Sequence, residues 1–457
     1  MNEYEALVRE YRIRDLPKLT RRDEIIRDLP EPKRFNMYHV VVGMRRSGKS
    51  FYLFQMISDL HKAGVDPDHI FYFDFSDDRL EPMSPTCGSD VIEEYYRQVP
   101  AAREQGAYLF LDEVQELGEW QGLLRRLSQN ERVTLTVTGS SSKLSAGELG
   151  TKSRGRAHSH VLYPLSFAEF CRFSGRDELA KGAAAGEAVS RAEQTLLAGL
   201  YDRYLVEGGF PGVFGMPSAD RIEVLQGYVR DVVARDVAER HGKGDIALAN
   251  QLARFALRNT GCDFSLNNLS ETLSALGYKA YWGKLNDLSE LMRQAYLFHV
   301  LPEFTMQLKP SSTAVPKVYA ADPGLAYAVS RANQQDVGKR LETAVYLELA
   351  RRLAGSRDET VASWSAPAPQ REKVDFVVGD ALALEPYRAY QVCADMSAAR
   401  TRKRKLRALG SAMNAGSLDT GTVITLDQEE ELSIEEGTVL VIPAWRWSLA
   451  WTTELPL

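Results

Sequence analysis

Residues 43–50 read Gly43-Met44-Arg45-Arg46-Ser47-Gly48-Lys49-Ser50, a complete G-x-x-x-x-G-K-[ST] phosphate-binding loop. The apolar run 37–42 before the loop predicts a buried strand, and the helical spacing of apolar residues in 51–60 predicts a helix. This strand, loop and helix order lets backbone N–H groups wrap a polyphosphate at a helix N-terminus. The alternative, a glycine-containing turn with a surface lysine, does not account for that context.

The loop predicts a site for ATP and Mg²⁺. A lysine at this position reaches the β- and γ-phosphates, and the hydroxyl that follows it ligates the metal. The residues expected to contact the nucleotide are Gly43, Arg46, Ser47, Gly48, Lys49, Ser50 and Phe51.

The composition is that of an ordinary globular protein. The chain has 457 residues, 44% of them apolar and 26% charged, which is enough for about three domains. No stretch approaches the roughly 18 apolar residues of a membrane span, and the polar, acidic N-terminus is not a secretory signal. Four scattered cysteines and no CxxC pair indicate a reducing cytoplasm. The net charge of −6 means that any contact with nucleic acid requires a local basic patch.

Alternating strands and helices follow the loop. The expected strands are 37–42, 70–75, 107–111, 133–138 and 160–163. This alternation predicts an α/β fold, a parallel sheet with helices on both faces.

The third of these strands leads into two acids: the four hydrophobic residues Tyr108-Leu109-Phe110-Leu111 are followed by Asp112-Glu113. About 65 residues after a phosphate-binding loop, this pattern indicates a Walker B motif, because both motifs then lie at the carboxyl ends of strands. We expect Asp112 to hold Mg²⁺ together with Ser50, and Glu113 to polarise the attacking water. A helix cap formed by Asp112 is the alternative.

Two further elements are expected to act on the γ-phosphate. Ser140, or its competitor Thr138, follows the next strand and is placed to sense the phosphate, although a plain serine-rich turn explains the same letters. Arg154 and Arg156 lie in Thr151-Lys152-Ser153-Arg154-Gly155-Arg156 and suit an arginine finger that reaches a neighbouring subunit. A solvated basic loop is the alternative for either arginine.

Six motifs in this order resemble the bacterial and archaeal AAA-type ATPases that carry a C-terminal domain of unknown function. They are the phosphate-binding loop, Leu111-Asp112-Glu113-Val114-Gln115, Thr138-Gly139-Ser140-Ser141-Ser142, Tyr163-Pro164-Leu165-Ser166-Phe167-Ala168-Glu169-Phe170, Tyr204-Leu205-Val206-Glu207-Gly208-Gly209-Phe210-Pro211 and Val318-Tyr319-Ala320-Ala321-Asp322-Pro323-Gly324. In that family the middle segment resembles a winged helix and the tail resembles the PD-(D/E)XK nuclease fold. The family's loop ends in Gly-Arg, which favours Arg156 as the finger.

The resemblance and the patterns together imply a domain order. It comprises an N-terminal helical segment (1–35), an AAA-type P-loop core (36–172), a helical lid and connector (173–230), a winged-helix-like domain (231–316) and a restriction-endonuclease-like α/β domain (317–457). Residues 179–190 are interpreted as a loose connector or insertion.

The nuclease-like tail departs from its pattern. A PD-(D/E)XK site needs two carboxylates for Mg²⁺ and a Glu-x-Lys, and Glu342 and Asp375 match the carboxylates. The third element reads Gln391-Val392-Cys393, in which glutamine is a poor ligand for a hard cation and cysteine cannot replace the lysine. We therefore interpret this site as degenerate, with Glu342 and Asp375 acting as ordinary surface or cap carboxylates.

Two further segments concern DNA. The run 400–407 is rich in cations (Arg400, Arg402, Lys403, Arg404, Lys405 and Arg407). A helix of this kind can lie along phosphates, or it can be a solvated face paired with acids. The middle segment suits a helix-turn-helix, in which Lys279 or Lys284 touches a phosphate, but such a module can also bind only protein. Trp445, Trp447 and Trp451 are expected in the core.

These patterns favour an ATP-hydrolysing motor or switch of the AAA type that acts on DNA in the cytoplasm, as a homo-oligomeric ring, a hexamer. No membrane contact is expected. Two alternatives stay open: a nucleotide-switched signalling or defence ATPase that binds protein, and an ATP-dependent nuclease.

Overall fold

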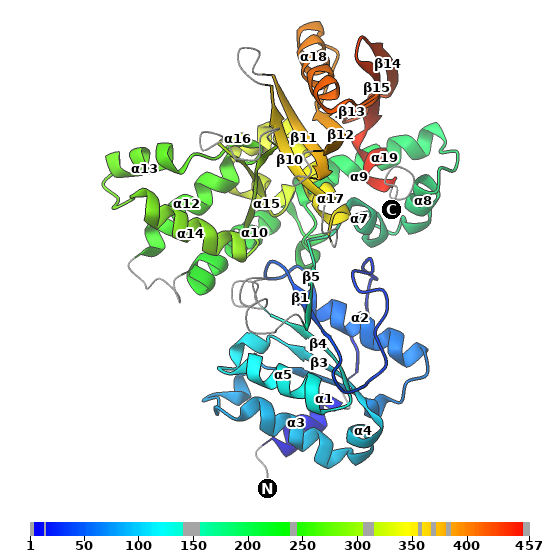
Figure 1. The fold of residues 1–457 in the computed structure, drawn as a ribbon, viewed down its shortest axis with the longest axis vertical. Helices are drawn as coiled ribbons and strands as arrows, with labels where there is room; N and C mark the ends of the chain where they lie inside the picture. The colour runs from blue at the N-terminus through cyan, green and yellow to red at the C-terminus, as the bar shows by residue number, and fades with distance from the viewer. Residues whose placement is uncertain are drawn as a thin grey trace. The chain divides into compact units, whose positions relative to one another are not determined.

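In the computed structural model, the described residues are 4–12, 15–139, 156–237, 245–304, 315–354, 359–366, 372–380 and 385–450. They form two compact units, residues 1–162 and 163–457, which are described separately (Figure 1). None of the described helices is long and apolar enough to cross a membrane.

The described strands of the first unit form a five-stranded parallel sheet in the order β2-β3-β4-β1-β5. The three middle strands are almost wholly buried, as strands covered on both faces must be. This confirms the predicted α/β fold with a parallel sheet. The strands are β1 (Tyr38–Val42), β2 (Ile70–Asp74), β3 (Ala107–Asp112), β4 (Val133–Thr138) and β5 (Ala157–Val161).

Helices connect these strands. Parallel neighbours need crossovers, and the connections from β1 to β2, from β2 to β3 and from β3 to β4 each contain at least one described helix. The described α-helices are α1 (Glu5–Arg12), α2 (Lys49–Lys62), α3 (Cys87–Gln98), α4 (Pro100–Gln105) and α5 (Trp120–Asn130). Short 3-10 turns lie at η1 (Pro67–His69), η2 (Asp78–Leu80) and η3 (Val114–Glu116).

The expectation of a helical N-terminal segment over 1–35 is wrong for most of that range. Among its described residues only α1 is helical, and residues 15–32 form neither helix nor strand. Three prolines in this stretch cannot donate helix hydrogen bonds. Its backbone instead bonds to α2: Gln55 Oε1 accepts from the Arg22 N–H at 2.7 Å, and the Tyr52 hydroxyl oxygen accepts from the Ile26 N–H at 3.0 Å.

The second unit begins with helices. Capping boxes start two of them, Ser166 with Glu169 for α7 and Ser190 with Glu193 for α9. The stretch 179–190 is not a loose connector throughout, because its first part is helical in α8. The elements are α7 (Phe167–Phe173), α8 (Asp177–Ala184), α9 (Arg191–Glu207), the 3-10 turn η4 (Pro211–Val213), α10 (Ser218–Asp231) and the π-helical turn η5 (Val232–Val237).

A set of helices with a small antiparallel sheet follows. The sheet has the order β6-β9-β7, so the last strand of the segment lies between the first two. The elements are α12 (Ile246–Arg258), β6 (Cys262–Asp263), α13 (Leu266–Ala275), α14 (Trp282–Gln294), β7 (Phe298–Leu301), β8 (Glu303–Phe304) and β9 (Lys317–Ala320).

The chain then forms a mixed sheet in the order β14-β15-β13-β12-β11-β10-β8. Neighbouring residues of β11 point to opposite faces, since Phe376 packs with α17 and Val377 packs with α18. The elements are α15 (Pro323–Val329), α16 (Arg331–Gln335), α17 (Val337–Arg352), β10 (Glu359–Ser365), β11 (Lys373–Asp380), β12 (Glu385–Val392), α18 (Ala399–Gly416), β13 (Thr420–Thr425), β14 (Glu430–Ile434), β15 (Gly437–Pro443) and α19 (Ala444–Leu449).

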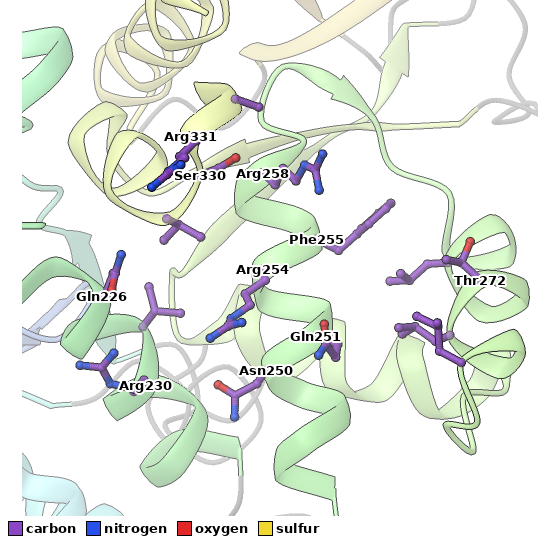
Figure 2. Close-up of a pocket in the computed structure, with 16 residues that line it drawn as sticks. Gln226, Arg230, Asn250, Gln251, Arg254, Phe255, Arg258, Thr272, Ser330 and Arg331 are labelled. Carbon is purple, nitrogen blue, oxygen red and sulfur yellow. The ribbon is translucent and has the colours of Figure 1, made fainter. Parts of the chain in front are cut away.

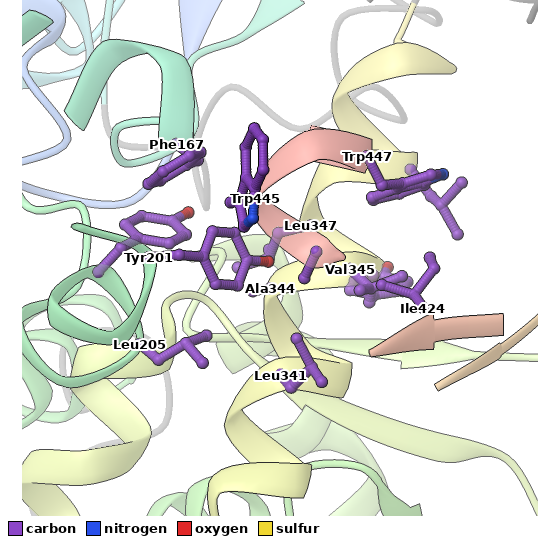
Figure 3. Packing of buried hydrophobic residues seen from close by; sticks show 14 of the residues in the cluster. Phe167, Tyr201, Leu205, Leu341, Ala344, Val345, Leu347, Ile424, Trp445 and Trp447 are labelled. Carbon is purple, nitrogen blue, oxygen red and sulfur yellow. The ribbon is translucent and has the colours of Figure 1, made fainter. Parts of the chain in front are cut away.

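One apolar core joins the two ends of the second unit. Phe167 of α7 and Tyr201 of α9 pack in the same cluster as Leu341 of α17 and Trp447 of α19 (Figure 3). Trp445 and Trp447 are buried, as predicted, and Trp451 lies outside the described residues. The helices α7 and α9 are therefore part of the same packed body as the C-terminal sheet.

Candidate active site and surfaces

The phosphate-binding loop has the backbone geometry of an anion cradle. It follows β1, and α2 begins at Lys49, directly after Gly48 in the left-handed conformation (φ 99°). Gly43 also needs its lack of a side chain, because a Cβ there would lie 2.3 Å from the Leu162 carbonyl oxygen. The loop therefore presents N–H groups at the start of α2, as phosphate binding requires.

Two side chains of the loop fit a polyphosphate. The Lys49 ammonium is buried and donates to the carbonyl oxygens of Gly43 at 3.2 Å and Met44 at 3.4 Å. The Ser47 hydroxyl is fully buried and has no hydrogen-bond partner among the described residues. Buried polar groups are normally satisfied, so this orphaned hydroxyl and the lysine held over the loop suit a bound phosphate.

The other loop residues predicted to contact nucleotide are positioned as follows. Ser50 lies in the first turn of α2, and Phe51 and Arg46 are exposed. Arg46 has a left-handed backbone (φ 68°), which is uncommon for a residue with a side chain. Their exposure leaves both side chains accessible to a ligand.

Asp112 ends β3 and is completely buried beside hydroxyl groups. Its Oδ2 accepts from the Tyr72 hydroxyl at 2.9 Å, and its Oδ1 accepts from Thr138. Burial raises the pKa of Asp112, while side-chain hydrogen bonds with Ser50 and Thr138 act in the opposite direction. The nearby carboxylates of Glu113 and Asp74 raise the pKa further. Ser50 and Asp112 thus lie within hydrogen-bond contact, and this excess of negative charge suits a divalent cation.

Glu113 occupies the next position, in a left-handed backbone conformation (φ 49°). Its N–H donates to Thr138 Oγ1 at 3.2 Å, and its carboxylate accepts from the Gln115 amide, which also donates to Glu116 at 3.1 Å. Strained backbone of this kind persists where surrounding contacts hold it. The contacts of Thr138 and Gln115 fix the direction in which the Glu113 side chain leaves the sheet.

Two contributors to this site were not predicted from sequence. Tyr72 was assigned only to a strand, yet the pairing of Asp74 with Asp112 brings β2 beside Asp112. Arg22 is buried, and its guanidinium donates to the Ser47 carbonyl oxygen at 2.8 Å, so the N-terminal segment braces the loop. A tyrosine in a buried strand and an arginine in an irregular segment carry no motif that reveals these contacts.

The predicted γ-phosphate sensor and arginine finger are only partly included in the described residues. Ser140 and Arg154 lie outside the described residues. Thr138, the competing sensor, contacts both Asp112 and Glu113. The Arg156 carbonyl oxygen accepts from the Tyr38 N–H at 3.0 Å, and one of its guanidinium nitrogens is buried without a partner among the described residues. The roles of Arg154, Arg156 and Ser140 stay predictions.

The interpretation of Glu342 and Asp375 as surface or cap carboxylates is wrong, because both side chains are largely buried and pair with Lys317 in the second unit. Lys317 Nζ donates to Glu342 Oε1 at 2.8 Å and to Asp375 Oδ1 at 2.9 Å. Lys405 of α18 donates to Asp375 Oδ2 at 2.9 Å and to Gln391 Oε1 at 3.1 Å. We call these five residues the lysine–carboxylate cluster.

The charges of this cluster are balanced internally. Burial alone would raise the pKa of Asp375, but the ammonium groups of Lys317 and Lys405 outweigh it and hold the pKa at about 2. Burial and the Asp375 charge raise the pKa of Glu342, against the opposing effect of Lys317. Two ammonium groups thus lie where a nuclease of this pattern would hold divalent cations. Neither lysine belongs to the sequence pattern, so pattern reading missed both.

The basic run of α18 is divided between paired and free cations. Arg402 forms a bidentate pair with Glu430 at 2.6 and 2.7 Å, Arg407 pairs with Glu372 at 2.9 Å, and Lys405 belongs to the lysine–carboxylate cluster. Arg400, Lys403 and Arg404 are exposed and form no ion pair with any described residue. In the helical segment, Lys284 pairs with Asp245.

A cationic pocket lies beside α12 in the second unit. It has a volume of about 720 Å³, and its lining includes Arg230, Arg254, Arg258 and Arg331 but no acidic residue (Figure 2). The four arginines come from α10, α12 and the start of α16, and all are exposed. None of the four guanidinium groups forms an ion pair or hydrogen bond with another described residue. We call this feature the arginine pocket.

Known families match two parts of the chain. Residues 36–171 match a family described as an AAA domain, and residues 198–336 match a domain of unknown function (DUF8612). An uncharacterized protein of Methanocaldococcus jannaschii, MJ1544, is 26% identical over 454 residues, covering 98% of this chain and 95% of the relative. An uncharacterized protein of Haemophilus influenzae is 26% identical over 331 residues, covering 72% and 78%.

Solved structures give weaker similarity. The Walker-type ATPase of Pyrococcus abyssi has a TM-score of 0.41 and 13% identity, covering 64% of this chain and 90% of that one. The Aeropyrum pernix Orc1 protein, solved in complex with DNA, has a TM-score of 0.29 and 16% identity, covering 67% and 87%. Residues 36–171 are therefore similar to an AAA domain, and the parallel sheet with the phosphate loop between β1 and α2 is a P-loop NTPase fold.

Proposed function

We propose that this protein couples ATP hydrolysis to the remodelling of, or translocation on, duplex or branched DNA in the cytoplasm. The observation that carries the DNA part is the arginine pocket, because four guanidinium groups without a partner among the described residues surround one hollow and favour an anionic ligand there. Phosphate oxygens of a nucleic-acid backbone accept hydrogen bonds from arginine in the bidentate geometry that this side chain favours.

We assign the following roles in ATP hydrolysis to individual residues. In this scheme the loop N–H groups and Lys49 hold the β- and γ-phosphates, and Ser50 and Asp112 would hold Mg²⁺, whose charge would offset that of the phosphates. Glu113 orients and polarises the attacking water from its fixed position beside Thr138. Arg156, or Arg154, supplies positive charge from a neighbouring subunit of a hexameric ring, and Ser140 senses the γ-phosphate.

The helices and strands beside the arginine pocket favour the interpretation of this segment as a DNA-binding module. The order of helices α12, α13 and α14 and of the strands β6-β9-β7 supports the proposal of a winged-helix-like module here. The lining amides of Gln251 and Asn250 add polar groups next to the guanidinium groups. Arg400, Lys403 and Arg404 of α18 are further candidates for phosphate contact, because they too are exposed and unpaired among the described residues.

A second candidate function is a nucleotide-switched ATPase that binds a protein partner. Leu276, Tyr281 and Trp282 favour it, because these large apolar side chains are 69%, 66% and 53% exposed at the junction of α13 and α14. The nuclease alternative is disfavoured, since Lys317 and Lys405 already neutralise the carboxylates that a metal would need.

Changing Arg254 and Arg258 to alanine tests the DNA proposal. Both side chains are exposed, so the variant should fold. We expect DNA affinity to fall for every sequence, and the slope of log affinity against log salt to flatten by about 1.8, at about 0.9 per lost phosphate contact. Fluorescence anisotropy with single-stranded, duplex, forked and four-way DNA measures this, and ATPase rates with the same DNAs report stimulation.

The matched control is Arg293→Ala, an exposed arginine of α14 that is paired with Glu290. It should leave the salt slope and the DNA stimulation unchanged. Equal affinity and slope in wild type and the double variant would remove the pocket from DNA binding. A wild-type ATPase that no DNA stimulates would favour the protein-binding alternative.

A further inference from the structure

Three of the seven histidines in the chain converge on one place in the first unit. His39 lies on β1, and His158 and His160 lie on the neighbouring strand β5. The parallel register pairs His39 with His158, and His160 is two residues further along, so both β5 histidines point to the same face. No part of the ATP chemistry described above uses these side chains.

The ring nitrogens are close enough to share one ion. One ligand atom from each histidine can be chosen so that all lie within 4.8 Å of one another. His39 Nδ1 and His160 Nε2 are 3.0 Å apart, and the rings of His158 and His160 have centroids 4.2 Å apart. Two nitrogens bound to one tetrahedral Zn²⁺ at about 2.05 Å are roughly 3.3 Å apart, so binding requires side-chain shifts of up to about 1.5 Å. His158 is exposed and can supply that shift.

The second contact of His160 resembles that of a metal ligand. Its ring also hydrogen-bonds to the backbone of Ile25. Because Nε2 faces His39, this bond falls to Nδ1, which leaves the Nε2 lone pair directed at the cluster. Metal-binding histidines usually donate their other ring N–H to a carbonyl or carboxylate in this way.

Hydrogen bonds among the described residues do not explain why His158, the third histidine, lies beside the other two. One N–H bond satisfies the His39–His160 pair, and His158 is then a third imidazole packed against two others without a bond of its own among the described residues. A zinc ion coordinated by three histidines keeps a fourth position for water. The exposed side of His158 leaves room for that water.

We propose that His39, His158 and His160 bind one Zn²⁺ ion, which ties β5 to β1. The site lies close in sequence to two parts of the ATPase chemistry. His39 precedes Gly43 of the phosphate loop by four residues, and β5 begins directly after Arg156. A bound ion would therefore fix the edge strand that carries the predicted finger loop to the strand that carries the phosphate loop.

Zinc binding to the full-length, tag-free, nucleotide-free protein tests this proposal. We expect equilibrium dialysis with elemental analysis to give one Zn²⁺ per chain, and we expect Zn²⁺ to raise the melting temperature by at least about 3 °C. Co²⁺ in place of Zn²⁺ should give the visible absorption of a low-symmetry site. His158→Ala and His160→Gln should each weaken Zn²⁺ binding at least tenfold and abolish the Co²⁺ absorption.

Two variants control for the effects of substitution on folding and for binding at other histidines. His158 is exposed, so His158→Ala should fold with the wild-type melting temperature in the absence of zinc. His61→Ala, an exposed histidine near the end of α2, is the matched control and should bind Zn²⁺ as wild type does. Binding that persists unchanged in His158→Ala and His160→Gln, or a wild-type chain that binds no Zn²⁺ under these conditions, would overturn the proposal.

Discussion

Asp112 in the first unit and Asp375 in the second are both buried aspartates on strands of an α/β sheet, yet their surroundings differ in sign. Asp112 is bonded by the hydroxyls of Tyr72 and Thr138, and its charged neighbours Glu113 and Asp74 are acids. Asp375 is bonded by the ammonium groups of Lys317 and Lys405. Burial therefore raises the pKa of Asp112, whereas the lysines lower that of Asp375.

This difference separates a site that needs a cation from one that contains its own. Hydroxyl donors hold the Asp112 carboxylate in place without neutralising it, so we expect this site to bind Mg²⁺. In the lysine–carboxylate cluster, the ammonium groups of Lys317 and Lys405 already compensate the carboxylates. We therefore propose a catalytic role for Asp112 and a structural role for Asp375.

Glu113→Gln should produce the largest effect on the catalytic side of this comparison. An amide cannot polarise water, so we expect ATP to stay bound while the steady-state rate of hydrolysis falls about 10²- to 10⁴-fold. Glu116→Gln is the matched control, because Gln115 holds both acids and only Glu113 faces Thr138. A normal rate in Glu113→Gln would take that residue out of catalysis. Lys49→Ala should in addition weaken nucleotide binding.

Lys317→Met should have the largest effect on the structural side. Removing the ammonium leaves Glu342 and Asp375 facing each other in a buried position, which costs about 3–5 kcal/mol of unfolding free energy. Urea unfolding measures the loss. Lys373→Met removes an exposed lysine paired with Asp263 and should cost less than about 1 kcal/mol. Equal effects of the two substitutions would show that the cluster contributes no more than a surface pair.

Replacing Asp112 or Asp375 with asparagine should change the free energy of unfolding by smaller amounts and in opposite directions. At pH 7, without nucleotide or Mg²⁺, Asp112→Asn should stabilise the protein by about 1 kcal/mol, because it removes a buried charge. Asp375→Asn should destabilise it by about 2 kcal/mol, because the pKa of Asp375 falls from 3.8 to about 2 on folding. Denaturation at the same pH compares both with wild type.

The pH dependence of stability follows from the lowered pKa of Asp375. A carboxylate whose pKa is lowered on folding contributes stability that is complete above pH 3.8 and lost as the pH falls towards 2. Wild type should therefore lose this contribution between about pH 4 and pH 2, and Asp375→Asn should lack that part of the acid limb. An identical acid limb in wild type and Asp375→Asn would contradict the pairing of Asp375 with the two lysines.

The local motifs could be read from the sequence because each is contiguous. The phosphate loop, the acids that end β3 and the order of the parallel strands all follow from short patterns whose chemistry is local. The helical expectation for 1–35 failed because tertiary bonds of Arg22 and Ile26 to α2 outweighed local propensity. The basic run of α18 gave no sign that Arg402, Lys405 and Arg407 are paired, since their acidic partners lie 28, 30 and 35 residues away in sequence.

The sequence by itself determined the P-loop fold and the absence of a complete nuclease motif around Gln391, and it predicted the residues that would hold ATP and Mg²⁺. Only the tertiary structure decided which cations lie beside Glu342 and Asp375, that Tyr72 and Arg22 support the ATP site, and that four arginines and three histidines each gather in one place. The physical reason is distance: electrostatic and hydrogen-bond partners act over a few ångströms in space, and folding brings together residues that are far apart in the chain.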